Sequence, residues 1–138
     1  MPAERLLKCG DTLHISKRQT KKGQDETPHL WIIITDADPN TDEIVMVNLT
    51  THREGSDATV VLKKGDHPYI IHDSVVFFHD AKIVQISDLE QLMISYPNLC
   101  RKCDKCSNSV LKRIQAGLLK SEFTHKKVIA FCRKAWNL

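Results

Sequence analysis

The sequence predicts a mainly β protein in which a small antiparallel barrel is followed by a shorter helical tail. Up to about residue 86 the apolar runs are short and rich in β-branched residues, and turns separate them at about the eight-to-twelve-residue spacing typical of all-β domains. No helical period intervenes, which favours a closed antiparallel barrel over a parallel sheet. From Ser87 onward the apolar period becomes helical. We therefore assign residues 1–90 to the barrel and 91–138 to a basic helical tail packed on it.

Three strands are expected in the first half of the barrel. Gly10–Ile15 forms a short strand, and the polar stretch Ser16–Pro28 reads as a long exposed loop. His29–Thr35 is the clearest strand, because its continuous apolar and β-branched run indicates burial on both faces. Glu43–Thr50 follows an Asp-Pro-Asn-Thr turn, so these two strands are predicted to pair as a hairpin.

The second half of the barrel is expected to hold shorter strands. Ala58–Leu62 forms one, and His67–Ile71 is an edge segment because its proline cannot donate to a ladder. Ser74–Phe78 and Lys82–Ile86 are the two parts of one strand, which a bulge interrupts between them. A single helical turn over Asp88–Leu92 then ends the barrel.

Two helices are predicted in the tail. The first covers 110–120 and is capped by Ser107 or Asn108, and the second covers 125–136 and is capped by Thr124. Their apolar positions repeat at helical spacing; they are Val110, Leu111, Ile114, Leu118, Leu119, Val128, Ile129, Phe131, Cys132 and Trp136.

Charge and apolar patterning restrict the class of protein. The net charge of +3 is mild, but basic residues concentrate in the C-terminal third, where they form either a solvated face or a surface for RNA or a protein partner. No apolar run approaches the roughly 20 residues that span a bilayer, so a membrane partner is not expected. The N-terminus lacks the apolar core of a signal peptide, and we expect a cytoplasmic protein whose five cysteines are reduced.

A first group of candidate functional residues follows the strand that ends near Leu49. Thr50 and Thr51 supply hydroxyls, and His52 and Arg53 follow them directly. An arginine can hold a phosphate by two parallel hydrogen bonds, and a histidine can exchange a proton near neutral pH. The alternative is an exposed turn of ordinary polar residues.

A second group of candidate residues spans 67–82 and consists of His67, His72, Ser74, His79, Asp80 and Lys82. Its spacing matches no zinc signature. The residues either bind a metal ion, or serve turns and a satisfied His-Asp pair at the bulge.

A third group is the cysteine cluster Cys100, Cys103 and Cys106. Two thiolates separated by two residues can occupy adjacent corners of a zinc tetrahedron, and only Cys132 or His125 could complete four ligands. Three buried thiols on one broad helix face account for the same spacing. Zinc is therefore one alternative, and the absence of any cofactor is the other.

The order of these elements resembles a known family. Gly10-Asp11 opens a strand, a long polar loop follows, and the strands Leu30–Ile34 and Val45–Leu49 precede the run Ser74–Lys82. Over about residues 10–86 this order is similar to the MazF/PemK (Kid) toxins of bacterial toxin–antitoxin systems. The resemblance implies an SH3-like barrel that forms a homodimer, cleaves single-stranded RNA without a metal and is neutralised by an antitoxin protein.

The resemblance also implies roles for individual residues. The family's Thr or Ser after its third strand matches Thr50 or Thr51, and its late-strand Ser and basic residue match Ser74 and Lys82. His79 stands where the family has Asp. If the family's chemistry holds here, a base removes the ribose 2′-hydroxyl proton and a cation stabilises the transition state.

The chain departs from the family at one catalytic position. Thr27 stands where the family has a catalytic Arg before the strand proline, and only Lys21, Lys22, His29 or Arg53 could replace it. This departure bears on the nuclease activity and leaves the expected fold unchanged. A chain without that activity would instead be a barrel that binds RNA or a protein partner.

The leading hypothesis from the sequence is therefore a toxin-like endoribonuclease that cleaves single-stranded RNA without metal. The alternatives are a non-catalytic barrel that binds RNA or a protein, and a zinc-binding regulatory protein. In the leading hypothesis the long polar loop Ser16–Pro28 covers the RNA. The candidate catalytic residues are Thr50, Thr51, Arg53, His79, Lys82 and His29, and the candidate RNA-binding residues are Lys21, Lys22, His52 and Ser74.

Overall fold

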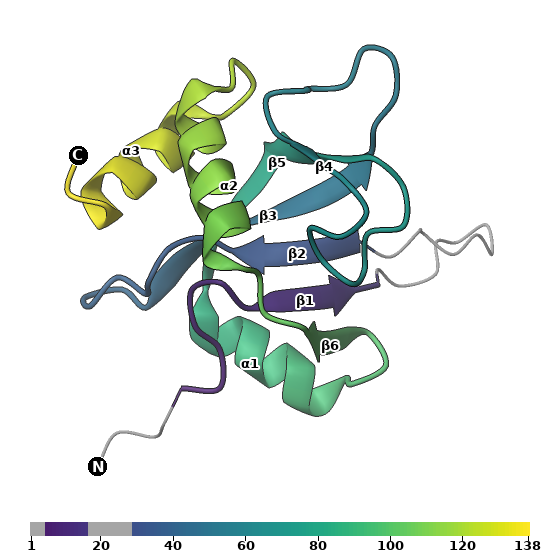
Figure 1. Ribbon diagram of the computed structural model, residues 1–138. Coiled ribbons are helices and arrows are strands. Elements are labelled where there is room, and N and C mark those ends of the chain that lie inside the picture. Colours follow the sequence, from purple (N-terminus) through teal and green to yellow (C-terminus); the bar gives the residue numbers. More distant parts are fainter. Residues whose placement is uncertain (1–4, 17–28) are drawn as a thin grey trace, which may run out of the picture.

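A curled six-stranded antiparallel sheet and three helices make up the part of the chain that the computed structural model describes, residues 5–16 and 29–138 (Figure 1). The sheet has the strand order β4-β5-β3-β2-β1-β6 and forms a half-barrel. Within those residues no helix has the length and apolarity needed to cross a bilayer. The strands are β1 (Thr12–Ile15), β2 (His29–Ile33), β3 (Glu43–Thr51), β4 (Val61–Leu62), β5 (Ser74–Gln85) and β6 (Cys100–Cys103); the helices are α1 (Ile86–Ser95), α2 (Asn108–Lys120) and α3 (Lys126–Ala135).

The predicted hairpin of β2 and β3 is confirmed, with Trp31 opposite Asn48 in its register. Alternate residues of β2 enter two different cores. Leu30 and Ile32 belong to the larger core, whereas Trp31 and Ile33 belong to the smaller one. This explains why the strand has no polar face, as its continuous apolar sequence predicts.

The two cores lie on opposite faces of the sheet, because successive strand residues point to opposite sides. The larger core is covered by α2 and α3, with Ile114 and Leu118 fully buried in it. The smaller core contains Leu89 of α1 and Leu7 of the N-terminal segment. The two layers are visible in Figure 1, where α2 crosses one face of the sheet and α1 lies along its lower edge.

The bulge predicted within the late strand is confirmed. Met46 pairs with Lys82 and Asn48 pairs with Phe77, so residues 78–81 of β5 face the single residue Val47 of β3. The extended backbone nevertheless continues through all twelve residues of β5. A bulge changes the direction of side chains, and this one contains His79 and Asp80 and lies next to Lys82.

Several expected elements differ in extent. The strand expected over Ala58–Leu62 has only the two residues of β4, and His67–Ile71 is a turn in place of an edge strand. The buried ring of His67 holds this turn: its Nδ1 accepts from Tyr69 N at 3.0 Å, and its Nε2 lies 2.6 Å from Asp104 O. The single helical turn expected over Asp88–Leu92 is the ten-residue helix α1.

The cysteine segment of the tail is an edge strand, so the helix face suggested for it is wrong. In β6, Cys100 pairs with Ile15 and Cys103 pairs with Thr12, which adds residues of the tail to the sheet. The helix that follows, α2, begins at a side-chain cap. Ser107 Oγ accepts from Val110 N at 3.2 Å, so Ser107 caps α2.

The cap expected for the last helix is displaced by one residue. His125 occupies the N-cap position of α3 and makes no side-chain cap bond. Thr124 is buried, and its hydroxyl donates to Leu118 O at 2.8 Å. The threonine therefore joins the end of α2 to the linker and does not cap α3.

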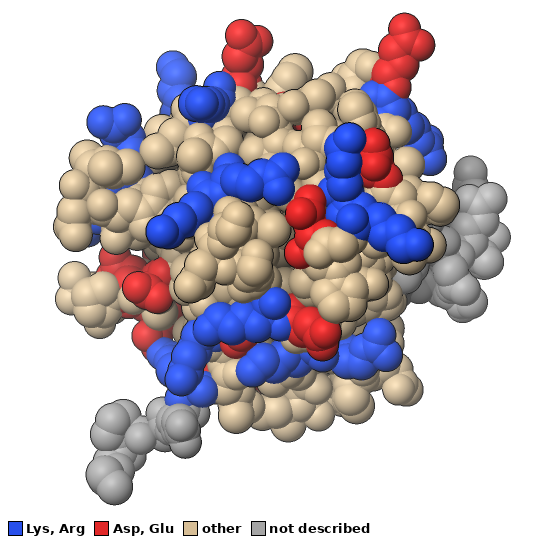
Figure 2. Space-filling model, in the orientation of Figure 1, with Lys and Arg blue, Asp and Glu red and all other residues tan. Residues whose placement is uncertain are grey.

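Basic and acidic side chains are interleaved over the face that carries α2, as Figure 2 shows. Arg113 Nη1 lies 3.5 Å from Asp66 Oδ2, and Lys102 Nζ lies 3.4 Å from Asp11 Oδ2. Since neighbouring carboxylates offset these cations, the positive charge of the tail does not form one continuous patch on this face.

Candidate functional site

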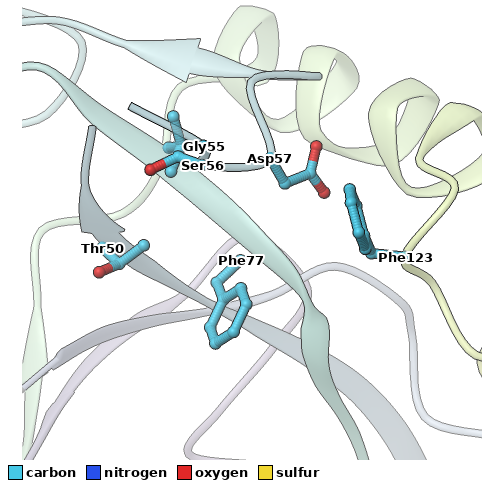
Figure 3. A pocket seen from close by; sticks show the side chains of 7 residues that line it. Thr50, Gly55, Ser56, Asp57, Phe77 and Phe123 are labelled. Carbon is cyan, nitrogen blue, oxygen red and sulfur yellow. The ribbon is translucent and has the colours of Figure 1, made fainter. Parts of the chain in front are cut away.

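An open pocket of about 160 Å³ lies at the ends of β3 and β5 (Figure 3). Thr50 pairs with Val75, and Asn48 pairs with Phe77, so Thr50 and Phe77 project from the same face of the sheet. The 52–57 loop and the linker between α2 and α3 form the other walls. The labelled lining residues are Thr50, Gly55, Ser56, Asp57, Phe77 and Phe123.

Asp57 holds the two non-sheet walls of the pocket together. Its Oδ2 accepts from Ser121 Oγ at 2.6 Å, and its Oδ1 accepts from Thr59 N at 3.1 Å and from Thr59 Oγ1 at 2.5 Å. Ser121 Oγ in turn accepts from Phe123 N at 3.1 Å. Burial raises the pKa of Asp57, but the hydrogen bonds from Ser121 and Thr59 outweigh it and hold the pKa below its usual value.

Two exposed imidazole rings lie beside the pocket. The ring centroids of Phe77 and His79 are 6.0 Å apart, and those of His79 and His125 are 4.9 Å apart. His125 is the N-cap residue of α3, and Lys126 and Lys127 follow it, both exposed. The chain therefore places an exposed aromatic ring beside two imidazoles, and two exposed lysines follow the second imidazole in the sequence.

Lys82 lies beyond the bulge and is paired with an acid. Its Nζ is 3.4 Å from Asp80 Oδ1, and Asp80 Oδ2 accepts from Asn48 Nδ2 at 2.9 Å. Asn48 is 3 % exposed, and its Oδ1 has no partner among the residues that the structure describes. The bulge thus carries a chain of polar contacts that ends in a buried, unpaired oxygen.

The other predicted site residues gather near the end of β3. Thr51 pairs with Ser74, and His52 N donates to Asp73 O at 3.0 Å. Arg53 is exposed at the start of the pocket loop, where its N–H donates to Ser56 Oγ at 3.0 Å. On the neighbouring strand, His29 Nδ1 lies 3.0 Å from Leu49 O.

The predicted residues do not all converge on one point. Thr50 pairs at Val75, whereas Lys82 pairs with Met46, four residues earlier on β3 and roughly 13 Å away at the rise of a strand. His79 lies between these positions and beside His125. Lys21, Lys22 and Thr27, together with the loop expected to cover the RNA, fall outside the described residues.

Sequence reasoning missed the aromatic and acidic parts of this site. Phe77 and Phe78 are adjacent in a strand, so their rings project from opposite faces of the sheet; Phe77 is 38 % exposed and Phe78 is fully buried. That signal was available in the sequence. Asp57, Phe123 and His125 reach the site through contacts across 45 or more residues, and no local pattern indicates them.

The cysteine cluster does not form a gathered ligand set in the structure. Cys100 belongs to the smaller core, whereas Cys103 packs against the larger one, because residues three apart in a strand point to opposite faces. Across residues 5–16 and 29–138, no group of three His, Cys, Asp or Glu side chains is placed to hold a metal ion. Zinc binding by these cysteines stays a prediction.

The pocket and the imidazole pair together can bind a flat ring and transfer a proton beside it. Aromatic side chains supply stacking surfaces, hydroxyls and a carboxylate supply directed hydrogen bonds, and imidazoles exchange protons near neutral pH. No family model and no curated protein matches the chain.

Proposed function

We propose that the chain binds single-stranded RNA along the pocket and the imidazole pair, and cleaves the strand without a metal ion. The observation that carries this proposal is the His79–His125 pair, whose rings are 4.9 Å apart and exposed beside Phe77. Two adjacent imidazoles can support metal-free RNA cleavage, one as a general base and one as a general acid.

The two imidazoles divide the chemistry between them. The neutral ring takes the proton of a ribose 2′-hydroxyl, and the 2′-oxygen attacks the adjacent phosphorus. The charged ring gives its proton to the departing 5′-oxygen, which leaves a 2′,3′-cyclic phosphate on one fragment and a 5′-hydroxyl on the other. After the step, each ring has the protonation state that the other ring had before it, so the protons balance.

The N-terminus of α3 supports the charge that develops on the phosphate. Lys126 and Lys127 lie in its first turn, where backbone N–H groups have no intrahelical acceptor and the helix dipole is positive. The first turn contains no acidic residue, and both ammonium groups are exposed. Donors and cations aimed at a phosphoryl oxygen commonly supply the largest share of such catalysis.

Single-stranded RNA fits this surface better than a duplex. Bases can stack on exposed rings such as Phe77 and Phe123 only when they are unpaired. The mild net charge of +3 agrees with a mode of binding in which stacking contributes beside phosphate contacts.

The resemblance to MazF/PemK toxins agrees with this proposal in its architecture. The curled half-barrel, the β2–β3 hairpin and the hydroxyls at the end of β3 support an SH3-like barrel of that kind. In our proposal the imidazole pair takes over the role of the family's arginine, whose position is Thr27 here. An antitoxin partner, a homodimer and growth arrest on expression remain part of the proposal.

An RNA-cleavage assay tests the proposal directly. The purified chain, treated with EDTA, is incubated with end-labelled single-stranded RNA, and the products are analysed for cyclic phosphate ends. We expect H79Q and H125Q each to reduce cleavage by roughly a hundredfold or more, the usual size of a general acid or base contribution. The control H72Q changes an exposed histidine outside the pair and should cleave normally. Absence of cleavage by the wild type, or equal rates for H79Q and H72Q, overturns the nuclease proposal.

A non-catalytic RNA-binding module is the second candidate, favoured by the pairing of Lys82 with Asp80. The cation nearest to His79 on β5 is thereby offset by a carboxylate 3.4 Å away. In that case the same surface binds RNA with a salt-dependent affinity, and H79Q lowers affinity without any turnover to lose.

A further inference from the structure

The size and lining of the pocket select one kind of ring. A cavity of about 150 Å³ with apolar walls is known to hold one benzene ring, and this pocket measures about 160 Å³. Figure 3 shows Phe123 across the opening from Thr50 and Ser56, with Phe77 below and Asp57 above. The space therefore suits a single six-membered aromatic ring that contacts two phenyl groups.

The polar groups of the pocket distinguish between six-membered rings. Asp57 is ionised at neutral pH and offers about four acceptor positions, of which Thr59 uses two and Ser121 uses one. One acceptor position on Oδ2 is left for a ligand. The hydroxyl of Ser56 accepts from Arg53 N and still has its own proton to donate.

Thr50 completes the polar edge opposite Asp57. No hydrogen bond joins its hydroxyl to another residue in the described part of the chain, although the side chain lines the pocket and is only partly exposed. The pocket therefore presents an acceptor at one edge and two hydroxyl donors at the other.

We infer that the pocket binds a cytosine base of single-stranded RNA and discriminates against uracil. The exocyclic amino group of cytosine donates to Asp57 Oδ2, while its ring nitrogen and carbonyl oxygen accept from the hydroxyls of Thr50 and Ser56. Uracil presents a carbonyl oxygen where cytosine has its amino group, so an acceptor would face the carboxylate. This inference rests on the proposed binding of RNA and is independent of cleavage.

Binding measurements with matched ligands test the specificity. Affinities of the full chain for fluorescein-labelled oligocytidylate and oligouridylate of equal length are compared at one salt concentration. We expect about a tenfold preference for oligocytidylate, the usual gain from one hydrogen bond to a charged acceptor. D57N should remove that preference, because it replaces an acceptor by an amide of the same size.

Two further variants test whether the preference for cytosine arises from the general charge of the loop or from stacking on an aromatic ring. E54Q removes a neighbouring exposed carboxylate of the same loop that does not line the pocket, and it should retain the preference. F123A removes an exposed ring and should weaken both ligands equally. Equal binding of the two oligonucleotides by the wild type, or the same change of preference in E54Q and D57N, overturns the inference.

A monomer titration distinguishes this failure from failure of the proposed function. Cytidine and uridine monophosphates are titrated separately while the NMR signals of the Phe77 and Phe123 rings are followed. If neither oligonucleotide is bound, stronger shifts with the cytidine nucleotide support the preference of the pocket for cytosine and contradict the proposed binding of RNA. Equal or absent shifts with both nucleotides contradict that preference, even if longer RNA binds and is cleaved.

Discussion

Ser121 Oγ donates a hydrogen bond to Asp57 Oδ2 at 2.6 Å and so joins the pocket loop to the linker between α2 and α3. The two residues are 64 positions apart in the sequence. Because Phe123 N donates to the same hydroxyl, this one serine also fixes the segment that carries the Phe123 ring. The pocket therefore depends on a contact between a loop and a linker, and the sheet supplies only one of its walls.

The Ser121–Asp57 contact predicts a pH-dependent contribution to stability. A carboxyl group whose folded pKa is lowered stabilises the protein above its unfolded pKa, and this contribution is lost as the pH falls through the folded pKa. We expect S121A to reduce the free energy of unfolding by about 1 kcal/mol at pH 7 and by less at acid pH, as Asp57 becomes protonated. Urea unfolding between pH 7 and pH 3 measures this.

The control for this prediction is S109A, which changes an exposed serine in the first turn of α2. Its effect should not vary with pH over the same range. A pH-independent loss of stability in S121A would show that packing, and not the charged acceptor, accounts for the effect.

Replacing Gly117 by alanine should destabilise the protein, although alanine has a higher helix propensity than glycine. A methyl group at Gly117 would lie 2.2 Å from Val60 Cγ2 and 3.0 Å from Phe78 Cζ, so α2 approaches the sheet too closely for any side chain. Alanine in an exposed helix interior would stabilise by about 1 kcal/mol. Here we expect G117A to destabilise the protein by about 1–3 kcal/mol, because overpacking a core forces its neighbours to shift.

A double-mutant cycle identifies the clash as the cause. V60A removes the nearest methyl groups, and the loss in G117A/V60A should be smaller than the sum of the single losses. Thermal unfolding of the four proteins measures the coupling. Additive losses would mean that the helix adjusts away from Val60.

The cysteines are predicted to differ in reactivity by their burial. Burial raises the pKa of Cys132 to about 12 and that of Cys106 to about 11, and it also raises the pKa of Cys100. Since the thiolate is the reactive form, iodoacetamide at pH 8 should modify these three only after unfolding. Cys103 is partly exposed on the edge strand and should react first. Peptide mass spectrometry gives the order.

The same experiment with added zinc tests the metal alternative. Cys100 and Cys103 project from opposite faces of β6, so zinc should not protect Cys103 from iodoacetamide. Protection by an equimolar amount of zinc, with a matching metal content by elemental analysis, would support the zinc-binding protein instead.

A strand whose own residues show a β pattern could be predicted from the sequence. A strand that forms only because it pairs with a segment far away in the sequence could not. The continuous apolar run of β2 and the bulge in β5 follow from local composition, and both are confirmed. The edge strand β6 has four residues and owes its pairing to β1, almost ninety positions earlier. Its Cys-Arg-Lys-Cys sequence contains no period that indicates a strand.

The candidate site shows the same division between local and distant signals. The sequence predicts the hydroxyls and cations at the end of β3 as site residues, because they directly follow a strand. The sequence indicates His125 only as a candidate metal ligand, because nothing near it in the sequence shows that its ring lies 4.9 Å from His79. The linker between α2 and α3 reaches the site through tertiary contacts alone.

Replacing Asn48 by leucine should affect the stability of the protein and its cleavage activity differently. Its buried Oδ1 has no partner within the described residues, and an unpaired buried acceptor costs about 1–3 kcal/mol. Asp80 is partly exposed and keeps its ion pair with Lys82 when the amide is removed. We therefore expect N48L to leave the free energy of unfolding unchanged or to raise it by about 1 kcal/mol, as measured by urea unfolding.

Although N48L should not lower stability, we expect it to lower the rate of RNA cleavage. The amide fixes Asp80 through its 2.9 Å hydrogen bond, and Asp80 is adjacent to His79 at the bulge. A leucine releases that carboxylate, so RNA cleavage should fall severalfold while affinity for RNA is retained. V47A removes apolar contacts from the same stretch of β3 and should lower stability by about 1–3 kcal/mol without a selective loss of cleavage. If N48L instead destabilises the protein and cleaves normally, the asparagine is a structural residue and the bulge does not position the imidazole pair.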